Sequence, residues 1–286
     1  MIQTLTQVST IQELRSLIRE ARQAGKRIGF VPTMGYLHEG HASLVKQARL
    51  TCDLVVMSIF VNPLQFGPNE DFSRYPRDIV RDREIARSAG VDLLFTPSVE
   101  EMYPTEVLTK VSVAKVSEPL CGKSRPGHFD GVATVVMKLF QIVQPDDAFF
   151  GQKDAQQVAV IQQMVRDLSV PVNIVVCPIV READGLAMSS RNVYLREEER
   201  EQATILYRTL QHVQERLKSC PAVETLKDEM VRMIQSQPLA EIDYAEILHY
   251  PELTPVTELK PGDRIIAALA VRFGKTRLID NLIAEI

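Results

Sequence analysis

Two histidines three residues apart, His38 and His41, stand where an apolar segment leads through a turn into a helical pattern. Imidazole rings at this spacing lie on one side of a turn or helix start and can donate to phosphate oxygens. A helix start also offers unpaired N–H groups and the positive end of the helix dipole, and Gly35 and Gly40 let backbone approach a ligand. The pattern H-x-G-H alone fits two solvated or buried histidines better than a site, so the neighbouring loops must decide.

Four other loops carry polar or cationic side chains, and the first three follow strand-like segments. Taken singly, each is more readily structural, since Asp154 fits a helix N-cap and Lys153 a solvated cation. Together, a histidine pair, a lysine, an arginine and two serines predict a cationic cradle, for which a triphosphate is the natural occupant. The loops are VNPLQFG with Asn62 and Gln65, GQKDAQQ with Gly151, Lys153, Asp154 and Gln157, MSSRN over 188–192, and CGKSRPGHFDGV with Lys123, Arg125 and His128.

Composition indicates a globular enzyme rather than a nucleic-acid or membrane protein. The chain has 286 residues, 45% of them hydrophobic and 24% charged, which suits one large or two modest domains. Its net charge of -4 argues against a broad basic face for nucleic acid and favours small-molecule substrates. No segment reaches the roughly 18 apolar residues of a membrane helix, and the start of the chain lacks a cationic leader. Four cysteines without CxxC or metal spacing, Cys52, Cys121, Cys177 and Cys220, suit reduced thiols, so a cytoplasmic protein is expected.

Alternating strand and helix patterns place these loops on a parallel sheet. Thr10 with Glu13 forms a capping box, and Gly25 ends the first helix. The near-continuous apolar run 54–61 predicts a central strand covered on both faces. We expect helices over 10–25, 40–51, 78–90, 131–143 and 154–168, and strands over 28–31, 54–61, 92–97 and 173–180. This α/β succession predicts a doubly wound, Rossmann-like domain over residues 1–180, with its ligand crevice beyond the carboxyl ends of the strands.

The pattern changes after Val180. Helices are expected over 196–219 and 224–236, followed by two strands over 243–250 and 264–280. Residues 181–286 therefore predict a smaller α+β domain that closes over the site. The MSSR loop falls at the junction, where clefts are common.

The motifs PTMGYLHEGH, FVNPLQF, GQKDAQQ and MSSRN, in this order, closely resemble those of the pantoate beta-alanine ligase family. This family is a branch of the HxGH nucleotidyltransferase superfamily, which is related to class I aminoacyl-tRNA synthetases. The resemblance covers most of the N-terminal domain and the junction loop. It implies that ATP and pantoate form pantoyl adenylate and pyrophosphate, after which beta-alanine displaces AMP. It also implies a homodimer and Mg²⁺ bound through the ATP phosphates, without a protein metal site.

The resemblance also implies roles for individual residues. His41 corresponds to the catalytic histidine, and His38, Lys153 and Arg191 share the charge stabilisation. Gln65, Gln157 and Asn62 are the expected pantoate-binding residues, and Gln65 also faces beta-alanine. The implied ATP-binding residues are Met34, Gly35, Tyr36, Leu37, His38, Glu39, Gly40, His41, Gly151, Gln152, Lys153, Asp154, Val180, Met188, Ser189, Ser190 and Arg191.

Two positions depart from the related patterns. The synthetase relatives carry a lysine before Met-Ser where this chain has Ala187, so Lys153 and Arg191 have to provide that charge. Gln152 stands where many members of the family have a glutamate.

Three other functions remain open from the residues. A sister adenylyltransferase would share H-x-G-H, but its acceptor pocket should be more basic than the glutamine loop FVNPLQF. A zinc hydrolase using His38, Glu39 and His41 fits poorly, because H-E-G-H is not H-E-x-x-H. A non-catalytic ATP-binding module would produce no AMP.

Overall fold

The computed structural model describes residues 5–68, 70 and 72–286, which form two compact units. The N-terminal unit contains the chain up to Val113, together with Arg125–Gln152 and Val160–Pro178. The C-terminal unit contains Ala114–Ser124, Lys153–Ala159 and Ile179–Ile286. The chain therefore enters the C-terminal unit twice before Ile179, in segments that the sequence pattern assigned to the N-terminal domain.

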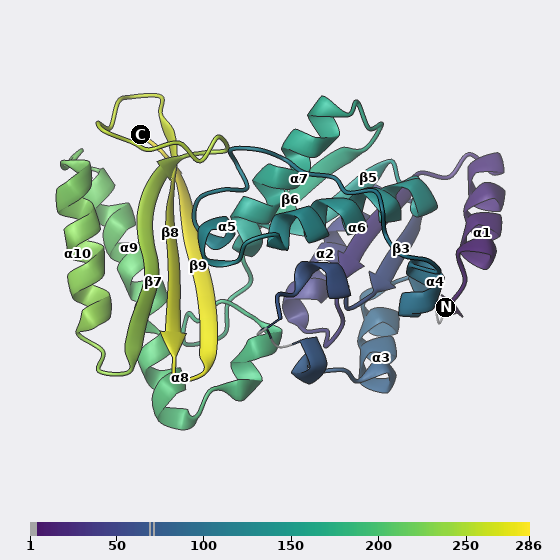
Figure 1. Ribbon diagram of the computed structural model, residues 1–286, viewed down its shortest axis with the longest axis horizontal. Helices are drawn as coiled ribbons and strands as arrows, with labels where there is room; N and C mark the ends of the chain where they lie inside the picture. The colour runs from purple at the N-terminus through teal and green to yellow at the C-terminus, as the bar shows by residue number, and fades with distance from the viewer. Residues whose placement is uncertain (1–4, 69, 71) are drawn as a thin grey trace. The chain divides into compact units, whose positions relative to one another are not determined.

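The N-terminal unit is built on a six-stranded parallel sheet in the order β1-β4-β3-β2-β5-β6. Three of its strands, β3, β5 and β6, are labelled in Figure 1. The order reverses between β2 and β5, which pair with each other, so the chain winds outward in both directions from this point. The predicted doubly wound α/β fold is confirmed. The strands are β1 (Thr6–Val8), β2 (Ile28–Thr33), β3 (Leu54–Ile59), β4 (Leu93–Phe95), β5 (Asp147–Gly151) and β6 (Asn173–Cys177).

Capping signals set the helix boundaries of this unit. Thr10 accepts a hydrogen bond from the backbone N–H of Glu13 at 3.3 Å, which starts α1. Asp78 accepts from Arg81 N at 3.0 Å at the start of α3, and Gly90 ends that helix in the left-handed region. One further helix, α7 (Ala155–Asp167), begins in the C-terminal unit and ends in this one. The other helices are α1 (Ile11–Gln23), α2 (Glu39–Arg49), α3 (Ile79–Ala89), α4 (Val99–Met102) and α6 (His128–Val143). The short 3-10 turns are η1 (Pro63–Gln65), η2 (Phe72–Arg74) and η3 (Gln152–Asp154).

The sheet buries one face under α2 and α3. Val45 and Ala48 of α2 and Ala86 of α3 pack against Val31, Met57 and Phe149 of the strands, all of them fully or almost fully buried. Right-handed crossovers explain why consecutive connections on one side of the switch point share a face. This core fixes the strand ends, and with them the loops that follow β2, β3 and β5.

The C-terminal unit contains a three-stranded antiparallel sheet on which α9 and α10 pack (Figure 1). Leu210 and Val213 of α9, Met230 of α10 and Leu269 of β8 belong to one buried cluster. The predicted α+β class is confirmed. The elements are α5 (Cys121–Ser124), η4 (Ser190–Tyr194), α8 (Glu197–Ala203), α9 (Ile205–Leu217), α10 (Val223–Gln235), β7 (Ala240–His249), β8 (Arg264–Phe273) and β9 (Thr276–Glu285).

Two sequence predictions for this unit were wrong. The segment 264–280, predicted as one strand, is a hairpin, because Gly274 with a φ of 56° and Lys275 form a two-residue turn between Phe273 and Thr276. The helix predicted over 196–219 is two helices separated at Thr204. The Thr204 hydroxyl donates to the Glu201 carbonyl at 2.8 Å, a local bond that competes with a regular helix.

Within the described residues, no helix is both long and apolar enough to span a membrane. The four cysteines are unpaired, and only Cys220 is exposed.

Candidate active site

The turn after β2 requires a glycine. Gly35 has a φ of 88°, and a β-carbon there would lie 2.9 Å from the Ile59 side chain and 3.1 Å from Asp82 Oδ2. Thr33 supports the turn, because its hydroxyl donates to the Ser58 carbonyl at 2.7 Å and accepts from Gly35 N at 3.2 Å. The loop that carries the histidines therefore leaves β2 in a fixed direction.

Asp82, which sequence reasoning missed, holds the same loop from α3. Its carboxylate accepts from Tyr36 N at 2.8 Å and from Leu37 N at 2.6 Å, and its side chain is almost fully buried. Burial raises the pKa of Asp82, and these two N–H donors act in the opposite direction. In the sequence the only signal is an acidic residue in the first turn of a helix, a place where most such residues merely complement the helix dipole.

His38 and His41 both use Nδ1 at the start of α2. Nδ1 of His38, the N-cap, accepts from Gly40 N at 3.1 Å, and Nδ1 of His41 accepts from His38 N at 3.3 Å. The two ring centroids lie 4.1 Å apart. A neutral imidazole that accepts at Nδ1 carries its proton on Nε2, so each ring is oriented with an Nε2–H donor.

A pocket of about 270 Å³ opens at the carboxyl ends of β2, β3 and β4. Met34 and Gly35 line it, together with Phe60 from the end of β3 and Asp82 from α3. Two of the predicted ATP-binding residues therefore border a cavity at the edge of the sheet where ligands of doubly wound folds bind.

Asn62 and Gln65 lie in the loop after β3 and are both buried. The Asn62 amide nitrogen donates to the Gly131 carbonyl at 3.1 Å and to Gln65 Oε1 at 3.3 Å, while its oxygen accepts from Tyr103 Oη at 2.9 Å. Both N–H groups of the Asn62 amide are thus used inside the protein. Gln65 Nε2 points to Met34 Sδ at 3.0 Å, which places the Gln65 amide beside the loop after β2.

The GQKDAQQ loop follows β5, the strand next to β2. Gly151 ends the strand, Gln152, Lys153 and Asp154 form η3, and α7 begins at Ala155. In the C-terminal unit, the Lys153 carbonyl accepts from Asn281 Nδ2 of β9 at 2.9 Å. The Gln157 side chain is half-buried and forms no hydrogen bond with the described residues, whereas its neighbour Gln156 holds the segment 116–121.

The segment from Val180 to Met188 folds back on itself within the C-terminal unit. Met188 N donates to the Val180 carbonyl at 3.0 Å, so these two predicted ATP-binding residues are adjacent. Arg181 pairs with the buried Asp280 at 2.6 Å, and burial raises the pKa of Asp280 against the effect of Arg181 and Lys153. Ser189 caps η4 by accepting from Arg191 N at 3.3 Å. β9 therefore contacts both Lys153 and Arg181, and Arg181 lies at the start of the folded segment 180–188.

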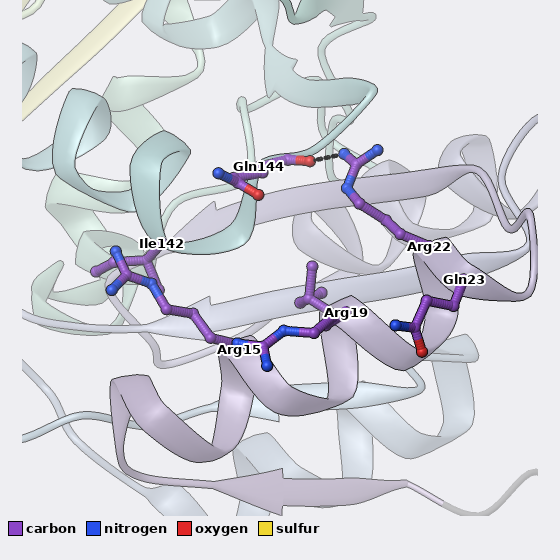
Figure 2. A pocket seen from close by; sticks show the side chains of 7 residues that line it. Arg15, Arg19, Arg22, Gln23, Ile142 and Gln144 are labelled. Carbon is purple, nitrogen blue, oxygen red and sulfur yellow. Dashed lines mark hydrogen bonds between the residues drawn. The ribbon is translucent and has the colours of Figure 1, made fainter.

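Figure 2 shows the side chains that line a second pocket, whose volume is about 490 Å³. Arg15, Arg19 and Arg22 of α1 line it beside the end of α6, at the amino ends of the strands. The Arg22 side chain donates to the Gln144 carbonyl, and Arg15 donates to the Gln141 carbonyl at 3.4 Å. Arg15 and Arg22 thus donate to carbonyls at the negative end of α6, and the residues that line this pocket include none of the predicted substrate-binding residues.

Among residues 5–68, 70 and 72–286, no group of three or more His, Cys, Asp or Glu side chains is arranged to hold a metal ion. His38, Glu39 and His41 do not form such a group.

Comparison with known proteins agrees with this geometry. The family model described as pantoate-beta-alanine ligase matches residues 6–283. A pantothenate synthetase from Caldicellulosiruptor bescii is 57% identical over 279 residues, covering 97% of this chain and 98% of the relative.

Solved structures give the same result. The pantothenate synthetase of Thermus thermophilus superposes with a TM-score of 0.91 at 49% identity, covering 97% of this chain and 99% of that one. A pantoate-beta-alanine ligase of Francisella tularensis, complexed with beta-gamma ATP and beta-alanine, gives a TM-score of 0.79 at 37% identity, covering 98% and 97%. With a family model over nearly its whole length and relatives above half identity, this chain belongs to the pantoate-beta-alanine ligase family.

Proposed function

We propose that this chain condenses pantoate with beta-alanine to give pantothenate, through a pantoyl adenylate and with release of pyrophosphate and AMP. The observation that carries the proposal is the family match over residues 6–283, within which the four sequence motifs lie on loops at strand ends and in the C-terminal unit. The enzyme is an AMP-forming ligase that works on small molecules.

The first half-reaction needs charge stabilisation more than it needs a base. A carboxyl with an ordinary pKa near 4 is already ionised at neutral pH and can attack the α-phosphorus directly. The difficulty is that both reactants are anions. Donors oriented toward the phosphates before the reaction lower the barrier by stabilising the charge that develops on the α-phosphoryl oxygens and on pyrophosphate.

The loop after β2 supplies one set of such donors. The start of α2 provides backbone N–H groups and a positive dipole end, and the Nε2–H groups of His38 and His41 add side-chain donors. We assign Met34, Gly35, Tyr36, Leu37, Glu39 and Gly40 to ATP as the backbone of this cradle. His41 is the principal catalytic donor.

A second set of ATP-binding residues comes from the loops after β5 and β6. Lys153 and Arg191 bring positive charge, and Ser189 and Ser190 bring hydroxyl donors. Gly151, Gln152, Asp154, Val180 and Met188 complete this set as backbone neighbours. Because Ala187 stands where the aminoacyl-tRNA synthetase relatives carry a lysine, Lys153 and Arg191 provide the positive charge.

Neutral amides orient pantoate. Gln65 and Gln157 hold its oxygens by hydrogen bonds without a tight ion pair, so the carboxylate keeps its nucleophilicity. Gln65 then faces beta-alanine in the second half-reaction. For Asn62 the buried amide suggests an indirect role, because both of its N–H groups are already bonded to protein atoms; we therefore propose that Asn62 positions Gln65 rather than touching pantoate.

We further propose that Mg²⁺ enters with ATP, where it would neutralise phosphate charge and would keep several of its waters. We also propose a cytoplasmic location, where thiols such as the four free cysteines stay reduced. Homodimerisation stays a prediction, which sedimentation equilibrium tests.

Pantoate-dependent exchange of labelled pyrophosphate into ATP, with Mg²⁺ and without beta-alanine, tests the mechanism. Exchange supports a reversible acyl-adenylate step. Formation of ADP rather than AMP after beta-alanine is added would indicate acyl-phosphate chemistry and contradict the proposal, and exchange without pantoate would indicate another acceptor.

A further inference from the structure

The segment RPGHFDG, residues 125–131, belongs to the fourth polar loop of the sequence and has no part in the proposed chemistry so far. Two of its side chains contact the backbone of the loop after β3. His128 Nδ1 lies 2.8 Å from the Gln65 carbonyl oxygen, and Arg125 Nη2 donates to the same oxygen at 3.4 Å. The backbone of a predicted substrate-binding residue is therefore contacted by two side chains of a distant segment.

Hydrogen-bonding chemistry fixes the orientation of His128. The Gln65 carbonyl can only accept, so Nδ1 of His128 is the donor. Arg125 Nη1 lies 3.0 Å from His128 Nε2, and because a guanidinium can only donate, Nε2 is the acceptor. His128 is thus held as the Nδ1–H tautomer, with each ring nitrogen matched to a partner of the right kind.

Arg125 is fixed in turn by Glu70. The two carboxylate oxygens accept from Arg125 Nε at 2.7 Å and from Nη2 at 2.6 Å, a bidentate pair. Burial acts to raise the pKa of Glu70, but the bonds from Arg125 outweigh it, and the pKa lies below its ordinary value. A charged pair therefore defines the plane of the guanidinium that contacts His128.

The same segment touches Gln65 from a second side. α6 approaches so closely that a β-carbon on Gly131 would lie 2.2 Å from the Leu64 carbonyl oxygen and 2.7 Å from Gln65 Cα. The Gly131 carbonyl accepts from Asn62, which also donates to the Gln65 side chain. Backbone and side chain of Gln65 are thus both constrained by residues 125–131.

We propose that residues 125–131 form a positioning clasp, in which His128 holds the Gln65 carbonyl, Arg125 orients His128 and Gly131 admits the close approach of α6. The clasp rests on the proposed function, because it acts through the amide that orients pantoate and faces beta-alanine. Its residues are positioning residues and touch no substrate.

A double-mutant cycle on the pyrophosphate exchange reaction tests the clasp. His128→Ala should raise the pantoate KM about tenfold, the equivalent of one well-formed hydrogen bond, with the ATP KM changed less than about twofold. In a Gln65→Ala background the same substitution should add less than about twofold, because the group it positions is gone. His128→Asn, whose amide nitrogen can stand in for Nδ1–H, should recover most of the pantoate affinity.

Controls separate positioning from general damage. His212→Ala removes a histidine of the C-terminal unit that contacts the Glu229 carboxylate at 2.8 Å, and it should leave both KM values unchanged. Urea midpoints establish that each variant is folded, and Arg125→Ala replaces His128→Ala if that chain does not fold. An unchanged pantoate KM, an equal rise in the ATP KM, or a fully additive double variant would overturn the clasp. A wild-type enzyme without pantoate-dependent exchange would instead show that the proposed function has failed.

Discussion

At the residue scale, each histidine of the H-x-G-H motif caps the start of α2, and in the proposed mechanism it also donates to phosphate. Nδ1 of His38 and of His41 accepts a backbone N–H and so helps to start α2, and this leaves the proton on Nε2. The cap therefore also orients the donor. Removing either ring would lose a helix cap together with the proposed phosphate contact, and variants have to be chosen to distinguish the two.

We predict that His41→Ala and Lys153→Ala each lower the rate of adenylate formation by on the order of 10²- to 10³-fold, the usual loss for one preorganised charge-stabilising donor. Single-turnover quench with labelled ATP measures it. His41→Asn is the matched control, because its side-chain oxygen can still accept from His38 N while the Nε2 donor is absent; it should keep stability and lose rate. Near wild-type rates in both alanine variants would refute the assignment.

Asp82 of α3 holds the loop after β2 through hydrogen bonds from Tyr36 N and Leu37 N. We predict that Asp82→Asn raises the ATP KM about tenfold and lowers the free energy of unfolding by about 1–3 kcal/mol, because an amide cannot accept from Tyr36 N and Leu37 N with both of its atoms. Steady-state kinetics and urea unfolding measure the two effects. Glu84→Gln on an exposed part of α3 is the control. A stable variant with unchanged ATP affinity would show that the loop does not need this carboxylate.

At the element scale, side-chain interactions join neighbouring parallel strands at their amino ends as well as at their carboxyl ends. Arg27, just before β2, pairs with Asp147 at the start of β5 at 2.6 Å, and Asn173 at the start of β6 donates to Asp147 at 2.9 Å. Burial acts to raise the pKa of Asp147, but the hydrogen bonds from Arg27, Asn173 and Cys52 outweigh it, and the pKa lies below its ordinary value. One buried carboxylate thus joins the beginnings of three neighbouring strands.

This lowered pKa gives a pH dependence of known sign. A carboxyl that is more acidic in the folded chain stabilises the fold above its unfolded pKa of about 4 and loses that contribution as the pH falls toward the folded value. We predict that Asp147→Asn is less stable than wild type near neutral pH and that this deficit shrinks between about pH 5 and pH 3. Urea unfolding across this range measures it, with the exposed Asp167→Asn as control. A deficit that grows on acidification would mean that the sign is wrong.

Element positions were predictable where a local signal marks them. Thr10 and Asp78 start helices, and Gly25 and Gly90 follow their ends, because capping depends only on neighbouring residues. β1 has three residues, too few for a pattern, and the Gly274 turn was hidden inside an apolar run. The roles of Asp82 and Asn62 depend on partners far along the chain, and a single sequence carries no signal for such contacts.

At the scale of the whole molecule, the chain has a net charge of -4 although both of its proposed first substrates are anions. Its overall field therefore does not attract them, and binding has to come from a few local donors and cations at the ends of strands. The division into units was harder to predict than the fold class. Residues 114–124 and 153–159 belong to the C-terminal unit because Gln156 ties them together and Asn281 holds Lys153, contacts without a local pattern.

Mg²⁺ is expected to reach the site together with ATP. Because Mg²⁺ dehydrates reluctantly and is usually held by substrate phosphates and water with few protein ligands, we expect it to bind as its ATP complex. We predict that EDTA abolishes pyrophosphate exchange, that added Mg²⁺ restores it in proportion to the MgATP formed, and that calorimetric titration of Mg²⁺ into the ATP-free enzyme shows no saturable binding below about 1 mM. Ca²⁺ is an informative comparison, since its larger and looser coordination should support ATP binding better than catalysis. Saturable Mg²⁺ binding without ATP would require a resident metal site and would change the assignment of the charge-stabilising groups.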